Sequence, residues 1–179
     1  MRLLFILLIC SVCFGQNTPI HEFEKGLPSS WLGRYEGQME IYSPTGLQQL
    51  VGVQLDLQIM DRENYWIYNM SYLSPQGEVL STKAYHIVYD ETNEKLWMDE
   101  GDSLLIEMTR MGNCLFDHYE LSGMFFNSSL CKQDSNLVFE ISGGQKKAAY
   151  TSPFIEEAEG VVESMRVNFL QRAVLKPIK

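Results

Sequence analysis

The chain has 179 residues, with 14 Lys or Arg against 23 Asp or Glu, which gives a net charge of −9. The length fits one domain of ordinary size. The charge argues against nucleic acid and anionic membranes as partners, because binding them needs a concentrated basic face and the basic residues here are scattered.

The N-terminus has the pattern of a secretory signal peptide. Arg2 precedes an apolar run from Leu3 to Phe14, and a small residue follows the run. The run is shorter than the roughly 20 apolar residues that span a bilayer. We expect residues 1–15 to be cleaved and the chain to be secreted or periplasmic, with no membrane span in the remainder. A buried first strand is the other interpretation of the run.

Residues 16–28 form a polar lead-in, and we expect residues 29–176 to fold as one β-barrel domain. After the lead-in, apolar residues alternate with polar ones. The clearest run is VGVQLDLQI, residues 51–59, in which every second position is apolar. This period of two is typical of a strand with one buried face.

Similar runs follow, separated by short stretches rich in residues that favour tight turns. They include NYWIYNMSY, KAYHIVYD, KLWMDE, SLLIEMTR, NCLFDHYEL and NLVFEIS. Short connections favour antiparallel neighbours, because a parallel crossover needs about a dozen residues or more. We predict an all-β fold, an antiparallel up-and-down barrel of about eight to ten strands, which leaves no exposed edge. A β-sandwich is the alternative.

The letters GDSL at residues 101–104 spell the signature of a large esterase family. In that family the serine lies near the N-terminus and depends on a later Asp-x-x-His. Here the motif lies past mid-chain, the only later histidine is His118, and Leu115 stands where the aspartate should be. A nucleophilic serine needs a base and a group that orients it. We interpret residues 101–104 as a turn and expect no enzyme activity from them.

Two cysteines remain after cleavage of the signal peptide, Cys114 and Cys131. If Ser122-Gly123 is a two-residue hairpin turn, both cysteines stand equally far from it and face each other. If the chain turns near Asn127-Ser128 instead, they lie tens of ångströms apart, at roughly 3.3 Å per residue along a strand. Both registers remain open from the sequence, and a disulfide forms only in the first.

The C-terminal part has a different period. Residues 152–164 carry apolar residues at helical spacing, with a serine–proline pair and acids near the start, which predicts one helix. Met165, Val167 and Phe169 alternate at period two. We therefore expect the helix to end near Ser164 and a last strand to close the barrel. One continuous helix is the alternative.

The aromatic and glycine pattern Trp31-x-Gly33-x-Tyr35-x-Gly37 resembles the opening of the first strand in calycin barrels, which include lipocalins and nitrobindin-like proteins. The resemblance implies a barrel whose end is plugged by the aromatic residue and whose interior binds a small molecule. Nitrobindin-like proteins bind haem through a histidine late in the chain, and no histidine follows His118. We expect no haem.

Other cofactors and metals have no motif. His21, His86 and His118 lie too far apart in sequence to form a typical metal-binding pair, and no phosphate-binding glycine loop or Cys-x-x-Cys is present. We expect no cofactor and no metal site.

Aromatic residues on two neighbouring strands point instead to ligand binding, since small-molecule pockets are largely apolar with a few polar groups. We predict a secreted binding protein for a small apolar or amphipathic molecule, and Arg110 is placed to orient a carboxylate. The predicted ligand-binding residues are Trp66, Tyr68, Tyr85, His86 and Arg110. The alternative is a barrel with a solid core that serves as a structural or protein-interaction module, with a protein partner that the sequence does not identify.

Overall fold

The computed structural model describes residues 25–156 and 158–178. The predicted signal peptide and most of the predicted lead-in lie outside the described residues. The elements are η1 (Ser29–Trp31), β1 (Gly33–Ser43), β2 (Gly46–Ile59), β3 (Tyr65–Leu73), β4 (Val79–Asp90), β5 (Lys95–Asp99), β6 (Leu105–Met111), β7 (Cys114–Leu121), β8 (Met124–Gln133), β9 (Asn136–Gln145), β10 (Tyr150–Glu156), β11 (Ala158–Ser164) and β12 (Phe169–Ile178).

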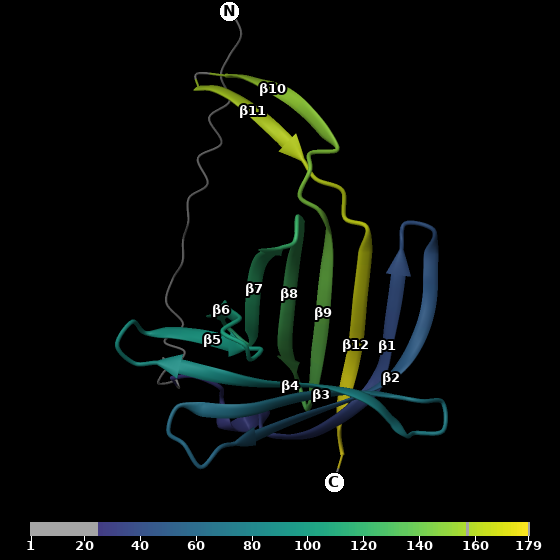
Figure 1. Cartoon of the computed structure of the whole chain (residues 1–179), viewed down its shortest axis with the longest axis vertical. Helices are drawn as coiled ribbons and strands as arrows, with labels where there is room; N and C mark the ends of the chain where they lie inside the picture. The colour runs from purple at the N-terminus through teal and green to yellow at the C-terminus, as the bar shows by residue number, and fades with distance from the viewer. Residues whose placement is uncertain (1–24, 157, 179) are drawn as a thin grey trace, which may run out of the picture.

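Ten strands form a closed barrel in the order β1-β12-β9-β8-β7-β6-β5-β4-β3-β2, and all neighbours are antiparallel. Figure 1 shows the wall of β3 and β4 crossing the wall of β8, β9 and β12. The predicted antiparallel barrel is confirmed and the sandwich is not formed. In the part of the chain that is described, no helix is long and apolar enough to cross a membrane.

Period-two alternation builds the core. In β2 the inward residues Val53, Leu55 and Leu57 are fully buried, while the intervening side chains face outward. Residues that pair directly across antiparallel strands share a face of the sheet. The partners of inward-facing residues therefore also face inward, from strand to strand around the barrel. The largest fully buried side chains are Met39, Leu55, Leu57, Ile87, Leu115, Leu137, Leu175 and Val53.

One end of the barrel is closed by the segment before β1. Trp31 is buried, and the Tyr35 hydroxyl donates a hydrogen bond of 3.0 Å to its carbonyl oxygen. Lys132 Nζ donates in turn to the Tyr35 hydroxyl, also at 3.0 Å. At Gly26 a Cβ atom would lie 2.3 Å from the Trp66 ring, so only glycine allows this approach. These contacts plug the barrel below Trp66.

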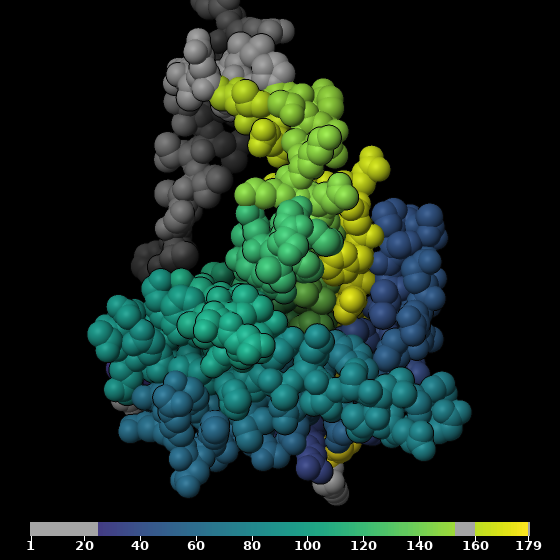
Figure 2. All heavy atoms as spheres, in the orientation of Figure 1, coloured from purple at the N-terminus to yellow at the C-terminus, as the bar shows by residue number. Residues whose placement is uncertain are grey.

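The predicted helix over residues 152–164 is wrong. This segment belongs to a two-stranded antiparallel hairpin of β10 and β11, in which Tyr150 pairs with Ser164. Figures 1 and 2 show the hairpin standing beyond the end of the barrel. Val161 and Val162 are 64 % and 47 % exposed, so their apolar side chains do not pack against a core. The helical spacing of the apolar residues is therefore not used to bury one face of a helix. Their β-branched side chains favour an extended backbone instead.

The predicted last strand is present and closes the barrel, but of the alternating residues that suggested it only Phe169 belongs to the strand; Met165 and Val167 precede it and are exposed. β12 begins at Phe169 and pairs with β9 on one side and β1 on the other. The backbone of β1 comes close to it, since a Cβ atom at Gly37 would lie 2.2 Å from the Val174 carbonyl oxygen. The glycine therefore permits the contact that joins the first and last strands.

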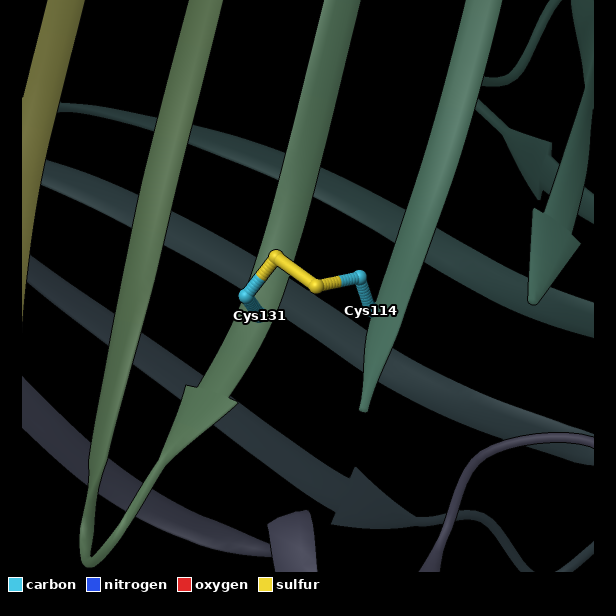
Figure 3. The surroundings of a disulfide bond; sticks show 2 residues. All are labelled: Cys114 and Cys131. Carbon is cyan, nitrogen blue, oxygen red and sulfur yellow. A yellow bond between two sulfur atoms is a disulfide. The ribbon is translucent and has the colours of Figure 1, made fainter. Parts of the chain in front are cut away.

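The hairpin of β7 and β8 turns at Ser122 and Gly123, whose φ angles are 52° and 78°. Two consecutive positive φ angles belong to the two-residue turn that suits a twisted hairpin. In the resulting register Cys114 pairs with Cys131, and the two form a disulfide with Cα atoms 4.0 Å apart (Figure 3). The first of the two registers that the sequence leaves open is therefore the observed one.

Candidate ligand cavity

A cavity of about 150 Å³ lies inside the barrel, in the half away from Trp31. Its lining comes from strands β3 to β9 and from β12, at positions that share the inward face with few exceptions. The lining residues are Tyr68, Tyr72, Lys83, Tyr85, Met98, Glu100, Ile106, Met108, Asp117, Tyr119, Ser128, Ser129, Leu130, Phe139, Ile141 and Gln171. Lys83 is the lining residue that is exposed to solvent, so the cavity opens next to Lys83.

Four tyrosines form much of the wall. The rings of Tyr68 and Tyr85 stack with their centroids 6.4 Å apart. Burial raises the pKa of all four hydroxyls, that of Tyr119 to about 12, so they remain protonated at neutral pH. Each therefore offers both a donor and an acceptor to the cavity.

Tyr68 is the deepest of these hydroxyl groups. Only 5 % of the residue's surface is exposed, and it lines the cavity. A buried tyrosine hydroxyl usually makes a hydrogen bond, because it can both donate and accept one. The cavity therefore holds a hydroxyl group that can bind a polar group of a ligand.

Two carboxyl groups reach the same space. Burial raises the pKa of Asp117, while the hydrogen bond from Ser128 and the charge of His118 oppose that change. Burial also raises the pKa of Glu100; the Tyr85 hydroxyl and Lys83 lower it, and Asp117 raises it. Asp117 Oδ1 is buried and has no hydrogen-bond partner. The cavity thus presents negative charge that the protein compensates only in part.

The sequence-predicted residues are divided among four places. Tyr68 and Tyr85 line the cavity. Trp66 is buried at the closed end, under Gly26. His86 pairs with Ile67 and Asp99 on the outward face of β4 and does not line the cavity.

Arg110 continues the inward face of Ile106 and Met108 on β6 and its Nε atom is buried, but it does not line the cavity. It borders a separate surface groove together with Gly26, Tyr89 and Thr109. The structure therefore brings together only two of the five predicted residues, and ligand binding by any of them stays a prediction.

The acidic residues of the cavity did not enter the predicted site. Asp117 follows Leu115 and precedes Tyr119 at period two, and Glu100 follows Met98 in the same way. That parity is the signal that could have placed both carboxyl groups inward.

The GDSL stretch forms the connection between β5 and β6, as predicted. The Leu104 N–H donates to the Gly101 carbonyl oxygen at 2.8 Å, and the Glu100 N–H donates to the Leu104 carbonyl oxygen at 3.0 Å. Asp102 and Ser103 both have positive φ angles, 48° and 67°. These are the features of a tight turn.

Metal ligands are not clustered. Over residues 25–156 and 158–178, no group of three or more His, Cys, Asp or Glu side chains could hold a metal ion.

Comparison with known proteins shows a fold and no family. No protein-family model matches the sequence, and no curated protein matches it. Among solved structures, Rv2717c from M. tuberculosis matches with a TM-score of 0.50 and 11 % identity, over 84 % of this chain and 94 % of that one. The S-type phycobiliprotein lyase CPES from Guillardia theta matches with a TM-score of 0.51 and 11 % identity, over 84 % and 89 %. At this identity the likeness shows the shared barrel fold alone.

Proposed function

We propose that this chain is a secreted, calycin-like binding protein that holds one small amphipathic molecule in the barrel cavity. The observation that carries the proposal is the cavity itself, which combines apolar walls with the buried Tyr68 and the unpartnered Oδ1 of Asp117. Pockets for small molecules have this composition, mostly apolar with a few convergent polar groups.

The size of the cavity limits the molecule. A cavity of about 150 Å³ in another protein binds benzene, so the space suits a ligand of about one aromatic ring. The solid-cored structural barrel is the alternative, and the cavity favours binding over it. The disulfide between Cys114 and Cys131 supports the proposed export, because such bonds persist in oxidising compartments.

Mass spectrometry of an organic extract tests the proposal. The protein is purified from its own source, shown to be folded, and extracted alongside two variants. Ile141→Phe adds volume to a cavity-lining residue, whereas Ile67→Phe makes the same change on the outward face of β3. We expect a stoichiometric small molecule in the wild type and in Ile67→Phe, and its loss in Ile141→Phe.

A blank extract from folded wild-type protein, together with no binding of one-ring probes in solution, would overturn the proposal. A molecule retained equally by Ile141→Phe would place binding outside the cavity and would also overturn it.

A further inference from the structure

We propose that the cavity selects a small organic cation, an ammonium group on a body of about one aromatic ring, held near Asp117 and Glu100. This inference rests on the proposed function, because it names the class of ligand that the same cavity takes.

The first support is the uncompensated acid. Asp117 receives one hydrogen bond, from Ser128 to Oδ2, and its Oδ1 has no partner. Burial of a carboxylate is costly unless a donor or an opposite charge satisfies it. An ammonium group supplies both, since it carries three donors and a positive charge.

The second support is the second acid. Glu100 lines the same cavity and interacts electrostatically with Asp117. Two carboxyl groups that face one space repel each other when both are ionised, and a cation between them removes that repulsion. A neutral ligand leaves the repulsion in place, and an anion adds to it.

The third support is the aromatic wall. Tyr68, Tyr72, Tyr85 and Tyr119 surround the space next to the two acids. Aromatic faces attract cations, most strongly where water is excluded. The hydroxyl of Tyr68 adds a buried acceptor that can receive an ammonium N–H.

The distribution of basic residues agrees with this assignment. Among the described residues that line the cavity, Lys83 is the only cationic one, and it is exposed beside Glu100. Arg110, which the sequence suggested as a carboxylate partner, lies in a separate groove. Among the described residues that line the cavity, no buried cation is therefore present to receive an acid.

The test uses three probes of matched size: benzylammonium, benzyl alcohol and benzoate. Each is titrated into the folded wild-type protein by isothermal titration calorimetry at neutral pH and low salt. We expect benzylammonium to bind about tenfold more tightly than benzyl alcohol, because charge-assisted hydrogen bonds are about twice as strong as neutral ones. Benzoate should bind least.

Three variants locate the effect. Asp117→Asn and Glu100→Gln keep the shape of the side chain and remove its charge, and each should weaken benzylammonium binding about tenfold while leaving benzyl alcohol unchanged. Glu107→Gln removes the same charge from the outward face of β6, where Glu107 pairs with Lys95. An exposed ion pair of this kind contributes little, so the affinity of the Glu107→Gln variant for benzylammonium should stay within about twofold of the wild type. Thermal melts confirm that each variant is folded.

The outcomes separate this inference from the proposed function. If benzyl alcohol or benzoate bound as tightly as benzylammonium or more tightly, the proposed binding function would stand, but the proposal of a cationic ligand would be overturned. Tight benzylammonium binding that Asp117→Asn and Glu100→Gln do not weaken would also overturn it. If none of the three probes bound to the folded protein, the proposal of a cationic ligand would be overturned. A blank organic extract would then overturn the proposed binding function as well.

Discussion

Ser128 and Asp117 face each other across β8 and β7, and the Ser128 hydroxyl donates a hydrogen bond to one carboxylate oxygen of Asp117. The other oxygen of Asp117 is buried without a partner. The barrel therefore holds a half-satisfied carboxyl group beside its cavity. Such a group lowers the stability of the empty protein when it is ionised, and this cost is expected where a ligand later supplies the missing contact.

Asp117→Asn should raise the stability of the ligand-free protein at pH 7. The folded-state pKa of Asp117 is raised, so the folded protein binds the proton more tightly than the unfolded chain does. The wild type therefore gains stability from this group as the pH falls through the folded pKa towards the unfolded value of about 3.9. Urea unfolding of both proteins between pH 4 and pH 7 measures the difference.

The gap between the two proteins should be widest at pH 7 and should close at the acid end. The groups that act on Asp117 are Ser128, His118 and Glu100, and all are unchanged in the variant. A loss of stability in Asp117→Asn that is the same at every pH would mean that the carboxylate is needed for the fold.

Ser128→Ala should destabilise the protein at pH 7 by about 1–3 kcal/mol, because it removes the one donor to a buried carboxylate. The same change in an Asp117→Asn background should cost less, since no charge is then stranded. Ser129→Ala is the matched control on the neighbouring residue. Urea midpoints of the four proteins give the coupling, and a coupling of zero would contradict the interaction.

Replacing both Cys114 and Cys131 by serine should lower the free energy of unfolding by about 3 kcal/mol, the cost of opening a loop of this length in the unfolded chain. The two cysteines stand next to inward-facing Leu115 and Leu130, on the opposite face. Affinity for a cavity ligand should therefore not change. Two free thiols in unreduced wild-type protein would contradict the bond.

Tyr35→Phe should destabilise the protein by about 1 kcal/mol without changing binding in the cavity. The lost hydroxyl donates to the Trp31 carbonyl oxygen and accepts from Lys132 at the closed end. Chemical unfolding measures the first effect and calorimetric titration with benzylammonium measures the second. A large change in affinity would show that the two ends of the barrel are coupled.

The barrel could be predicted because its period and its turns agree. Alternation in residues 51–59 places the core face of β2, and the turn at Ser122-Gly123 decides which residues oppose each other in β7 and β8. A two-residue turn fixes the register of its hairpin, so the same turn also decides the disulfide.

The hairpin of β10 and β11 could not be predicted in this way. Its backbone is set by pairing between two strands that no core covers, so the positions of its apolar residues carry no period of burial. The sequence predicts the aromatic part of the cavity because Tyr68 and Tyr85 lie on clearly apolar faces of their strands. It does not predict Asp117 and Glu100 as cavity residues, because acidic residues are mostly exposed and an acid on a strand or in a turn is expected to face solvent.

Closure of the barrel has a consequence for how the chain is made. β12 is synthesised after the other nine barrel strands, yet it alone joins β9 to β1. Until it emerges, β1 and β9 each present an open edge of unpaired amide and carbonyl groups, which is a template for pairing with another chain. A nascent chain that stalls within the β10–β11 hairpin is therefore expected to aggregate, and the interval before β12 arrives is where a chaperone would protect this protein most.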